Sequence, residues 1–287
     1  MRFVRLVTSG RTLFAIAVLA LLGACGASNS SSDTTTTSRP APTTTTTAPT
    51  DPDGSEVDRL PTVPSPSSTP SSPNLSTAAA QSAFLNRVFA DIQAVWKADF
   101  SHGGVAYQPA RLVIFKSAIS TACGTETAEV GPFYCPADRT VYLDTIFFTA
   151  LAARFGVMGD FAEAYVVAHE MGHHIQNLLG ISARVAALQA ASPPEKNSLS
   201  VSLELQADCF AGVWAHTAYA RNLLEPGDIE AALAAAQAVG DDFLAHASGA
   251  TVDADSWTHG TSAQRQQWFT TGFEDGNAPA CDTFKEA

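Results

Sequence analysis

Apolar residues recur at helical spacing through most of the chain after residue 75. The first such stretch runs from about residue 76 to residue 100, where an apolar side chain returns every three or four positions. Its members are Phe84, Leu85, Val88, Ile92, Val95 and Trp96. Ser76 or Thr77 is a suitable N-cap, and we interpret the apolar stripe as a face that packs in the core.

The same periodicity predicts six further helices. They cover residues 146–155, 161–179, 182–190, 195–222 and 226–239, and a last one begins after Thr261 and buries Trp268 and Phe269. Asp160 with Glu163 predicts a capping box for the second of these, and Thr261 with Gln264 predicts one for the last. Gly180 stands where a C-terminal glycine cap belongs.

Two short apolar runs, over residues 111–115 and 140–143, are typical of strands. Cysteines, glycines and prolines lie between them, so we expect a hairpin held by a disulfide in this stretch. Many helices with few strands predict an α+β fold that is dominated by helices and contains a small β-sheet.

The first 75 residues have a different pattern. Three arginines precede an apolar run at residues 12–22 that is too short to span a bilayer comfortably, so residues 1–24 resemble a lipoprotein signal peptide. The sequence from Leu22 to Cys25 resembles a bacterial lipobox, which implies cleavage before Cys25 and lipidation of that residue. An ordinary signal peptide or a short membrane anchor is the alternative. Each interpretation places the rest of the chain outside the cytoplasm.

Residues 26–75 are rich in Ser, Thr and Pro and have almost no apolar side chains, which predicts a disordered tether after the lipidated Cys25. Residues 76–287 are long enough for one domain with a substantial core. We therefore expect a domain anchored by lipid on the extracytoplasmic face of the cell membrane, with partial secretion as the alternative.

The chain carries 16 basic and 28 acidic residues, for a formal net charge of −12. This balance argues against binding to nucleic acid and against docking on anionic lipid head groups. The expected connection to the membrane is therefore the lipid on Cys25 alone.

Four cysteines remain besides Cys25, and an even number in an oxidising compartment predicts two disulfides. Three pairings are possible. We favour Cys123–Cys135 within one loop and Cys209–Cys281 between the tail and a helix. A second zinc site built from these cysteines is the alternative, but the chain has no C-x-x-C spacing.

The main chemical motif is His169-Glu170-x-x-His173. Residues four apart lie on one face of a helix, so the two histidines can chelate one ion. Glu170 is placed to reach a water molecule activated by that ion, as in a metal-assisted peptide hydrolase. The alternative is a pair of structural histidines in an Ala-rich core helix.

Zinc needs at least one more protein ligand, and the best candidate is Glu204. Asp208 lies four residues later on the same helix face, where it can accept the free ring N–H of a ligand histidine. The neighbouring residues are largely apolar, which would make unpartnered carboxylates costly there. A surface acidic pair on an amphipathic helix is the alternative.

With these residues, the chain resembles the gluzincin class, and more closely the bacterial putative neutral zinc metallopeptidase family. The matching stretches are 122–124, 131–136, 141–144, the motif helix, 204–212 and 259–269. The resemblance covers about residues 80–285 and implies a zincin-like fold, one zinc ion and Glu170 as the catalytic acid/base. The natural substrate is poorly defined across this family.

Other candidate residues have competing interpretations. His259, just before a helix, could donate to a tetrahedral oxyanion, with capping or packing as the alternative. Arg265 could act similarly, although pairing with acidic groups is the favoured interpretation. His174 lies about 100° round the helix from His173, so we interpret it as structural.

We therefore expect a zinc-dependent peptidase, and specifically an endopeptidase, that acts on a peptide or protein substrate in the cell envelope. The alternative is a zinc-stabilised, non-catalytic scaffold or a chaperone-like assembly factor. Cleavage of peptidoglycan cross-links is a third possibility, although the sequence contains no recognisable wall-binding module.

Overall fold

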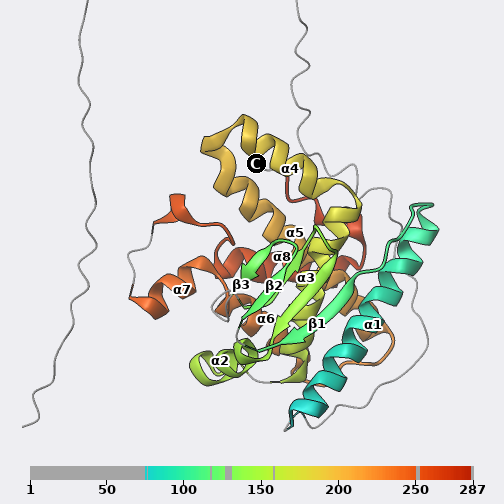
Figure 1. Cartoon of the computed structure of the whole chain (residues 1–287). Coiled ribbons are helices and arrows are strands. Elements are labelled where there is room, and N and C mark those ends of the chain that lie inside the picture. The colour runs from blue at the N-terminus through green and yellow to red at the C-terminus, as the bar shows by residue number, and fades with distance from the viewer. Residues whose placement is uncertain are drawn as a thin grey trace, which may run out of the picture. The chain divides into compact units, whose positions relative to one another are not determined.

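The structure is a computed structural model that describes residues 75, 77–116, 118–126, 131–157, 159–249 and 253–285 (Figure 1). The predicted signal peptide, Cys25 and all of the tether except Leu75 lie outside these residues. Within the described residues, no helix is long and apolar enough to cross a bilayer.

The first helix, α1, spans Ala78–His102 and buries the predicted apolar face. The Thr77 hydroxyl accepts a hydrogen bond from the Ala80 amide at 3.1 Å, so Thr77 is the N-cap. Phe89 and Phe100 join the buried face, whereas Val88 is only partly buried.

Seven more α-helices follow among the described residues, and they confirm a helix-dominated α+β fold. They are α2 Thr145–Phe155, α3 Asp160–Leu178, α4 Ile181–Ala191, α5 Lys196–Ala220, α6 Asp228–Ala238, α7 Asp241–Ser248 and α8 Ser262–Asp275. The sequence pattern did not predict α7. Short 3₁₀ turns occupy Pro193–Glu195, Ala254–Ser256 and Ala278–Cys281.

The two predicted capping boxes have different outcomes. At α8 the Thr261 side chain accepts from the Gln264 amide, and the Gln264 side chain accepts from Thr261 in return. At α3 the prediction is wrong, because Gly159 is the N-cap and Asp160 is the first helical residue. Glu163 instead accepts a hydrogen bond from Gln81 of α1 at 2.7 Å, so a tertiary contact replaces the local one.

The main sheet has the strand order β1-β5-β4, built from Arg111–Phe115, Thr140–Asp144 and Phe133–Cys135. β1 and β5 are parallel, so the two predicted strands are neighbours but do not form a hairpin. The hairpins are β4 with β5, and β2 (Ile119–Thr121) with β3 (Gly124–Glu126). The Cys123–Cys135 disulfide joins these two hairpins.

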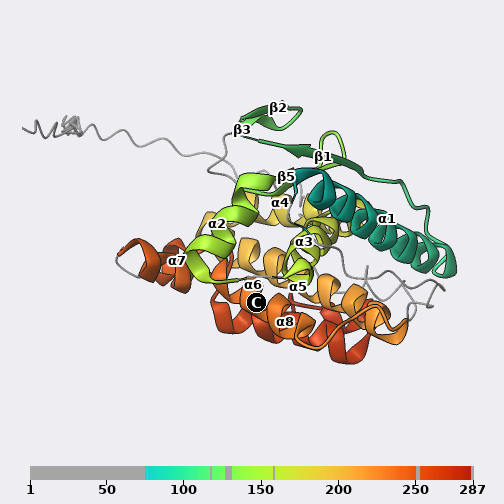
Figure 2. The same ribbon diagram turned by 90° about the horizontal axis from the view of Figure 1, so that it is seen from below.

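The elements pack in successive layers, which Figure 2 shows from below. The sheet lies on one side, α3 lies next to it, and α5 and then α8 follow on the side away from the sheet. Glycines let α5 and α8 approach closely, since a Cβ at Gly212 would clash with the Phe269 carbonyl oxygen and a Cβ at Gly272 with that of Cys209. The two motif-bearing helices, α3 and α5, are therefore central.

Candidate metal centre

Helix α3 carries His169, Glu170 and His173 at the centre of the fold. His169 and Glu170 are each 7% exposed, and the His169 and His173 ring centroids are 4.8 Å apart. The helix places the two imidazoles one turn apart on one face, as the H-E-x-x-H spacing predicts.

Helix α5 brings Glu204 against these rings. Its Oε2 lies 3.2 Å from His169 Nε2, and its Oε1 lies 3.4 Å from His173 Nε2. The approach depends on Gly172, because a Cβ there would lie 2.9 Å from both the Cα and the carbonyl oxygen of Ala207. A small residue between the motif histidines thus lets the third candidate ligand reach them.

The donor set fits a zinc ion. One ligand atom from each of His169, His173 and Glu204 lies within 4.8 Å of the others. Two ligands at about 2.1 Å from a tetrahedral ion are roughly 3.4 Å apart, and the two nitrogen–oxygen distances, which end on different oxygens of Glu204, are close to this value. Two imidazoles and one carboxylate also leave a fourth position for water or substrate, as catalytic zinc sites do.

Asp208 touches the His169 ring on the side away from Glu204. His169 Nδ1 donates to Asp208 Oδ1 at 2.8 Å, and the Tyr165 hydroxyl donates to the same oxygen at 2.5 Å. The Nδ1–H bond leaves Nε2 facing Glu204, which is the tautomer that a metal ligand needs. The structure thus brings Asp208 to the predicted position, and sequence reasoning missed Tyr165.

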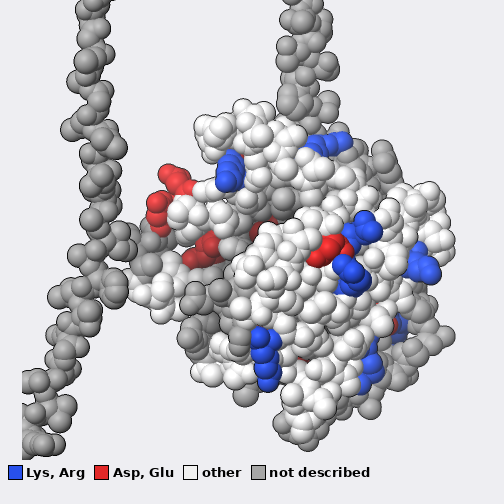
Figure 3. Space-filling view, in the orientation of Figure 1, with Lys and Arg blue, Asp and Glu red and all other residues white. Residues whose placement is uncertain are grey.

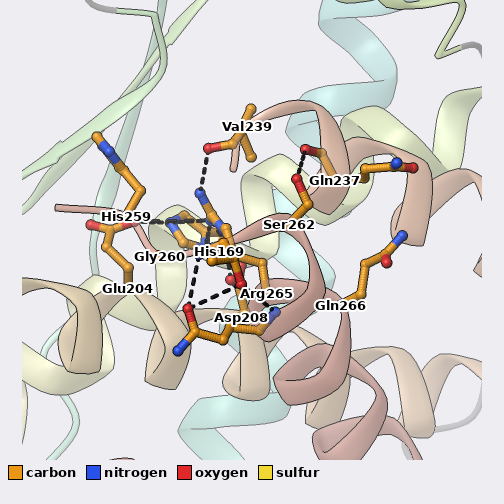
Figure 4. Close-up of polar contacts among 12 residues, drawn as sticks. His169, Glu204, Asp208, Gln237, Val239, His259, Gly260, Ser262, Arg265 and Gln266 are labelled. Carbon is orange, nitrogen blue, oxygen red and sulfur yellow. Dashed lines mark hydrogen bonds and ion pairs between the residues drawn. The ribbon is translucent and has the colours of Figure 1, made fainter. Parts of the chain in front are cut away.

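Arg265 of α8 completes this cluster, as Figure 4 shows. Its Nε donates to Asp208 Oδ2 at 2.8 Å and its Nη2 to Oδ1 at 2.9 Å, which is a bidentate ion pair. Its Nη1 donates to the Val239 carbonyl at 3.3 Å. Arg265 therefore pairs with an acidic group, as favoured from the sequence.

The cluster is electrostatically suited to hold a cation. Burial lowers the pKa of His169, but the carboxylates of Asp208 and Glu204 outweigh burial and raise it to about 10. Burial also opposes the charge of Glu204, yet the two histidines hold the pKa of this carboxyl well below its usual range. A proton on His169 can balance the negative charge of the two carboxylates, and a bound metal ion can do the same.

Glu170 is chemically distinct from Glu204. Burial raises the pKa of Glu170, although the nearby histidines oppose this shift. Among the described residues, none forms a hydrogen bond with its carboxylate. A buried carboxylate with a raised pKa is suited to accept and return a proton.

His173 has a neutral partner where His169 has a charged one. Its Nδ1 bonds to Gln176 Oε1 at 2.9 Å, and Gln176 in turn contacts Gln206 of α5 at 3.2 Å. Sequence reasoning missed both glutamines. The available signal was a polar residue inside each largely apolar stretch, which burial then leaves in need of partners.

His259 lies beside the site but outside the metal group. Its ring is 48% exposed, and its Nδ1 lies 3.1 Å from Asp241 Oδ1. The backbone amides of Thr258, His259 and Gly260 all donate to Asp241 Oδ2, so one carboxylate shapes this turn. In Figure 4 the ring points away from the His169–Arg265 cluster.

The turn is nevertheless close to Glu204 along α5. A Cβ at Gly260 would lie 3.1 Å from the Val201 side chain and 3.3 Å from that of Leu205, the neighbour of Glu204. Figure 3 shows a hollow on one face of the molecule, with acidic side chains in it and beside it. The side chains of His173 and Glu204 are 21% and 19% exposed, so solvent reaches this part of the cluster.

Two further predictions concern His174 and the cysteines. His174 Nε2 donates to the Gln108 carbonyl at 2.8 Å, its Nδ1 accepts from the Tyr134 hydroxyl at 3.0 Å, and burial lowers its pKa to about 4. His174 is therefore structural. Both favoured disulfides are present, Cys123–Cys135 and Cys209–Cys281.

Comparisons with known proteins match the part of the chain that contains the site. The family described as putative neutral zinc metallopeptidase matches residues 55–284. The uncharacterized protein YpfJ of Escherichia coli strain K12 is 48% identical over 202 residues, 70% of each chain. The uncharacterized protein Rv2575 of Mycobacterium tuberculosis strain H37Rv is 46% identical over 209 residues, 68% of each chain. No solved structure gives a significant match.

Proposed function

Because this chain belongs to the putative neutral zinc metallopeptidase family, we propose that it is a zinc-dependent endopeptidase with a single zinc ion. The ligands would be His169, His173 and Glu204. The observation that carries the proposal is the position of their donor atoms, which lie within 4.8 Å of one another, with the buried Glu170 carboxylate interacting electrostatically with both histidines.

When bound, zinc would supply a Lewis acid that polarises a substrate carbonyl and lowers the pKa of water. Glu170 would take the proton of the attacking water and deliver it to the leaving amine. Its raised pKa supports both steps, because a carboxylate that binds protons more readily is a stronger base.

His259 is the proposed donor to the oxyanion that develops on the substrate. It lies on a turn packed against Val201 and Leu205 of the helix that carries Glu204, and its side chain is 48% exposed. Asp241 accepts from the turn and lies against the ring, which points away from the cluster, so the imidazole would have to leave Asp241 and turn toward the site to donate.

The proposed site of action is the cell envelope, with a peptide or protein as substrate. The lipobox-like sequence before Cys25 and the Ser/Thr/Pro-rich stretch after it support a lipid-anchored domain on the extracytoplasmic face. The acidic composition supports a partner other than nucleic acid.

Glu170→Gln tests the proposed chemistry. The variant should keep its zinc and lose about 10²–10⁴-fold in peptide hydrolysis, because the amide cannot accept the proton. N-terminal proteomics of envelope fractions would report cleavage in cells, and casein would serve as the purified probe. The matched control is Glu163→Gln, which removes another carboxylate of α3 and should leave hydrolysis unchanged.

Full activity in Glu170→Gln would remove this residue from the mechanism. A zinc-stabilised scaffold or chaperone-like factor makes a different prediction, since Glu170→Gln would then rescue a deletion strain as well as the wild-type protein does.

A further inference from the structure

A chain of two buried glutamines connects the His173 ring to the C-terminal segment. Gln176 Oε1 lies 2.9 Å from His173 Nδ1, and Gln176 Nε2 donates to Gln206 Oε1 at 3.2 Å. Gln206 Nε2 donates to the Cys281 carbonyl at 2.9 Å. Both glutamines are 0% exposed, so their amide groups depend on protein partners.

The donor and the acceptor of every hydrogen bond in this series follow from the Cys281 carbonyl. A backbone carbonyl can only accept, so the Cys281 oxygen must face the Gln206 amide nitrogen. Gln206 Oε1 therefore faces Gln176, and it must accept from the Gln176 amide nitrogen. That leaves Gln176 Oε1 facing His173, and an amide oxygen can only accept a hydrogen bond.

His173 must consequently carry its proton on Nδ1. When the ring is neutral, its Nε2 is then left with a lone pair, 3.4 Å from Glu204 Oε1. The Gln176 amide also donates to the Leu203 carbonyl at 2.7 Å, which belongs to the residue before Glu204. One amide group thus orients a candidate ligand on α3 and holds the backbone next to another on α5.

We infer that Gln176 and Gln206 are positioning residues for the metal centre, which hold His173 in the Nδ1–H tautomer and anchor it to the C-terminal segment. The Cys209–Cys281 disulfide keeps the terminal carbonyl of this chain against α5. The inference rests on the proposed zinc site, but it predicts metal affinity, which can be measured without any substrate.

A second buried hydrogen bond between the C-terminal segment and α5 provides a matched control. The Thr283 hydroxyl donates to the Ser202 carbonyl at 2.7 Å, and both residues are buried. This bond contacts neither glutamine and neither motif histidine. Thr283→Val should therefore weaken the docking of the segment without changing zinc affinity.

The experiment is a zinc competition titration of the full chain against a chromogenic chelator. Methionine keeps the length of glutamine without its amide, so Gln176→Met should lower zinc affinity by roughly 10–100-fold. Gln206→Met should lower it by roughly 2–10-fold, because Leu203 still holds one amide hydrogen of Gln176. The double variant should match Gln176→Met alone, since Gln206 acts through Gln176.

Wild-type affinity in Gln206→Met, or an equal loss in Thr283→Val, would overturn the inference. A wild-type protein that binds no zinc would instead overturn the proposed function, so the two failures are distinct. NMR of the zinc-loaded wild-type protein adds a test without substitution. The His173 Nδ1–H proton should be protected from exchange and close to the Gln176 side chain, and an unprotected proton there would also overturn the inference.

Discussion

The two motif histidines lie one turn apart on α3, yet their Nδ1 atoms have partners of different charge. His169 donates to a carboxylate, Asp208, which is itself paired with Arg265. His173 donates to a neutral amide, Gln176, whose support passes through Gln206 to the main chain. We refer to these as the charged side and the neutral side of the site.

The comparison shows two physical solutions to one requirement, which is to keep Nε2 of each ring free for a metal. A buried carboxylate binds the ring N–H strongly but must be compensated, and Asp208 is 0% exposed. Arg265 and Tyr165 supply that compensation. The neutral side needs no countercharge, but every amide group in it must find a partner.

The largest expected effect comes from the residue that both sides share. Glu204→Gln should leave a protein that is nearly metal-free after mild chelation, because only two protein ligands remain. Asp208→Asn should bind zinc about 10–100-fold more weakly than wild type but still measurably, because it loses only a partner of His169. Metal content after dialysis measures both. Retention of zinc by Glu204→Gln and its loss from Asp208→Asn would mean that Asp208 is the third ligand.

The charged side should also matter more for folding. Arg265→Met leaves the Asp208 carboxylate without its ion pair, and breaking a buried pair in this way costs about 3–5 kcal/mol in the free energy of unfolding. The matched control is Arg221→Met, which breaks another bidentate pair with Asp91. Asp91 is 28% exposed and can be hydrated, so Arg221→Met should lower the free energy of unfolding by less than Arg265→Met does. It should not change zinc affinity.

Urea denaturation of the metal-free variants would measure both losses. If both arginine variants lost the same free energy of unfolding, the burial of Asp208 would not be the reason that it needs Arg265.

The smallest expected effect is a difference in pH dependence. In the metal-free protein the pKa of His169 is about 10, so zinc must displace a proton and should bind more tightly as pH rises toward that value. This raised pKa also stabilises the metal-free fold below about 6.5, and that contribution is lost as pH rises through about 10.

Asp208→Asn removes one cause of the raised pKa, so the pH slope of zinc affinity should flatten. Gln176→Met changes no charge and should keep the wild-type slope while lowering affinity throughout. Titrations across pH 6–9 would compare them, and a flattened slope in Gln176→Met would contradict the distinction between the two sides.

The sequence alone determined the local features of this protein. The periodicity of residues 84–96 identified the buried face of α1, and the Thr261 and Gln264 pair identified the start of α8. The spacing of His169 and His173 placed both rings on one face of α3. These features depend on residues within about one to three turns of each other, whose relative positions are set by helix geometry itself.

Tertiary packing decided which of these faces meet. Glu204 reaches the histidines because Gly172 and Ala207 let α3 and α5 approach, and Arg265 reaches Asp208 from a helix 57 residues away. The failed capping box has the same cause, since Glu163 bonds to Gln81 of α1 instead of its own helix.

The partners of the motif histidines illustrate the limit most clearly. Asp208 could be proposed from its spacing to Glu204, because both lie on one face of one helix. Gln206 could not, because its partner is a backbone carbonyl at Cys281, which has no side-chain signature in the sequence. Helix periodicity fixes the direction of a side chain around its own axis, but only the packed structure determines which group from elsewhere in the chain lies there.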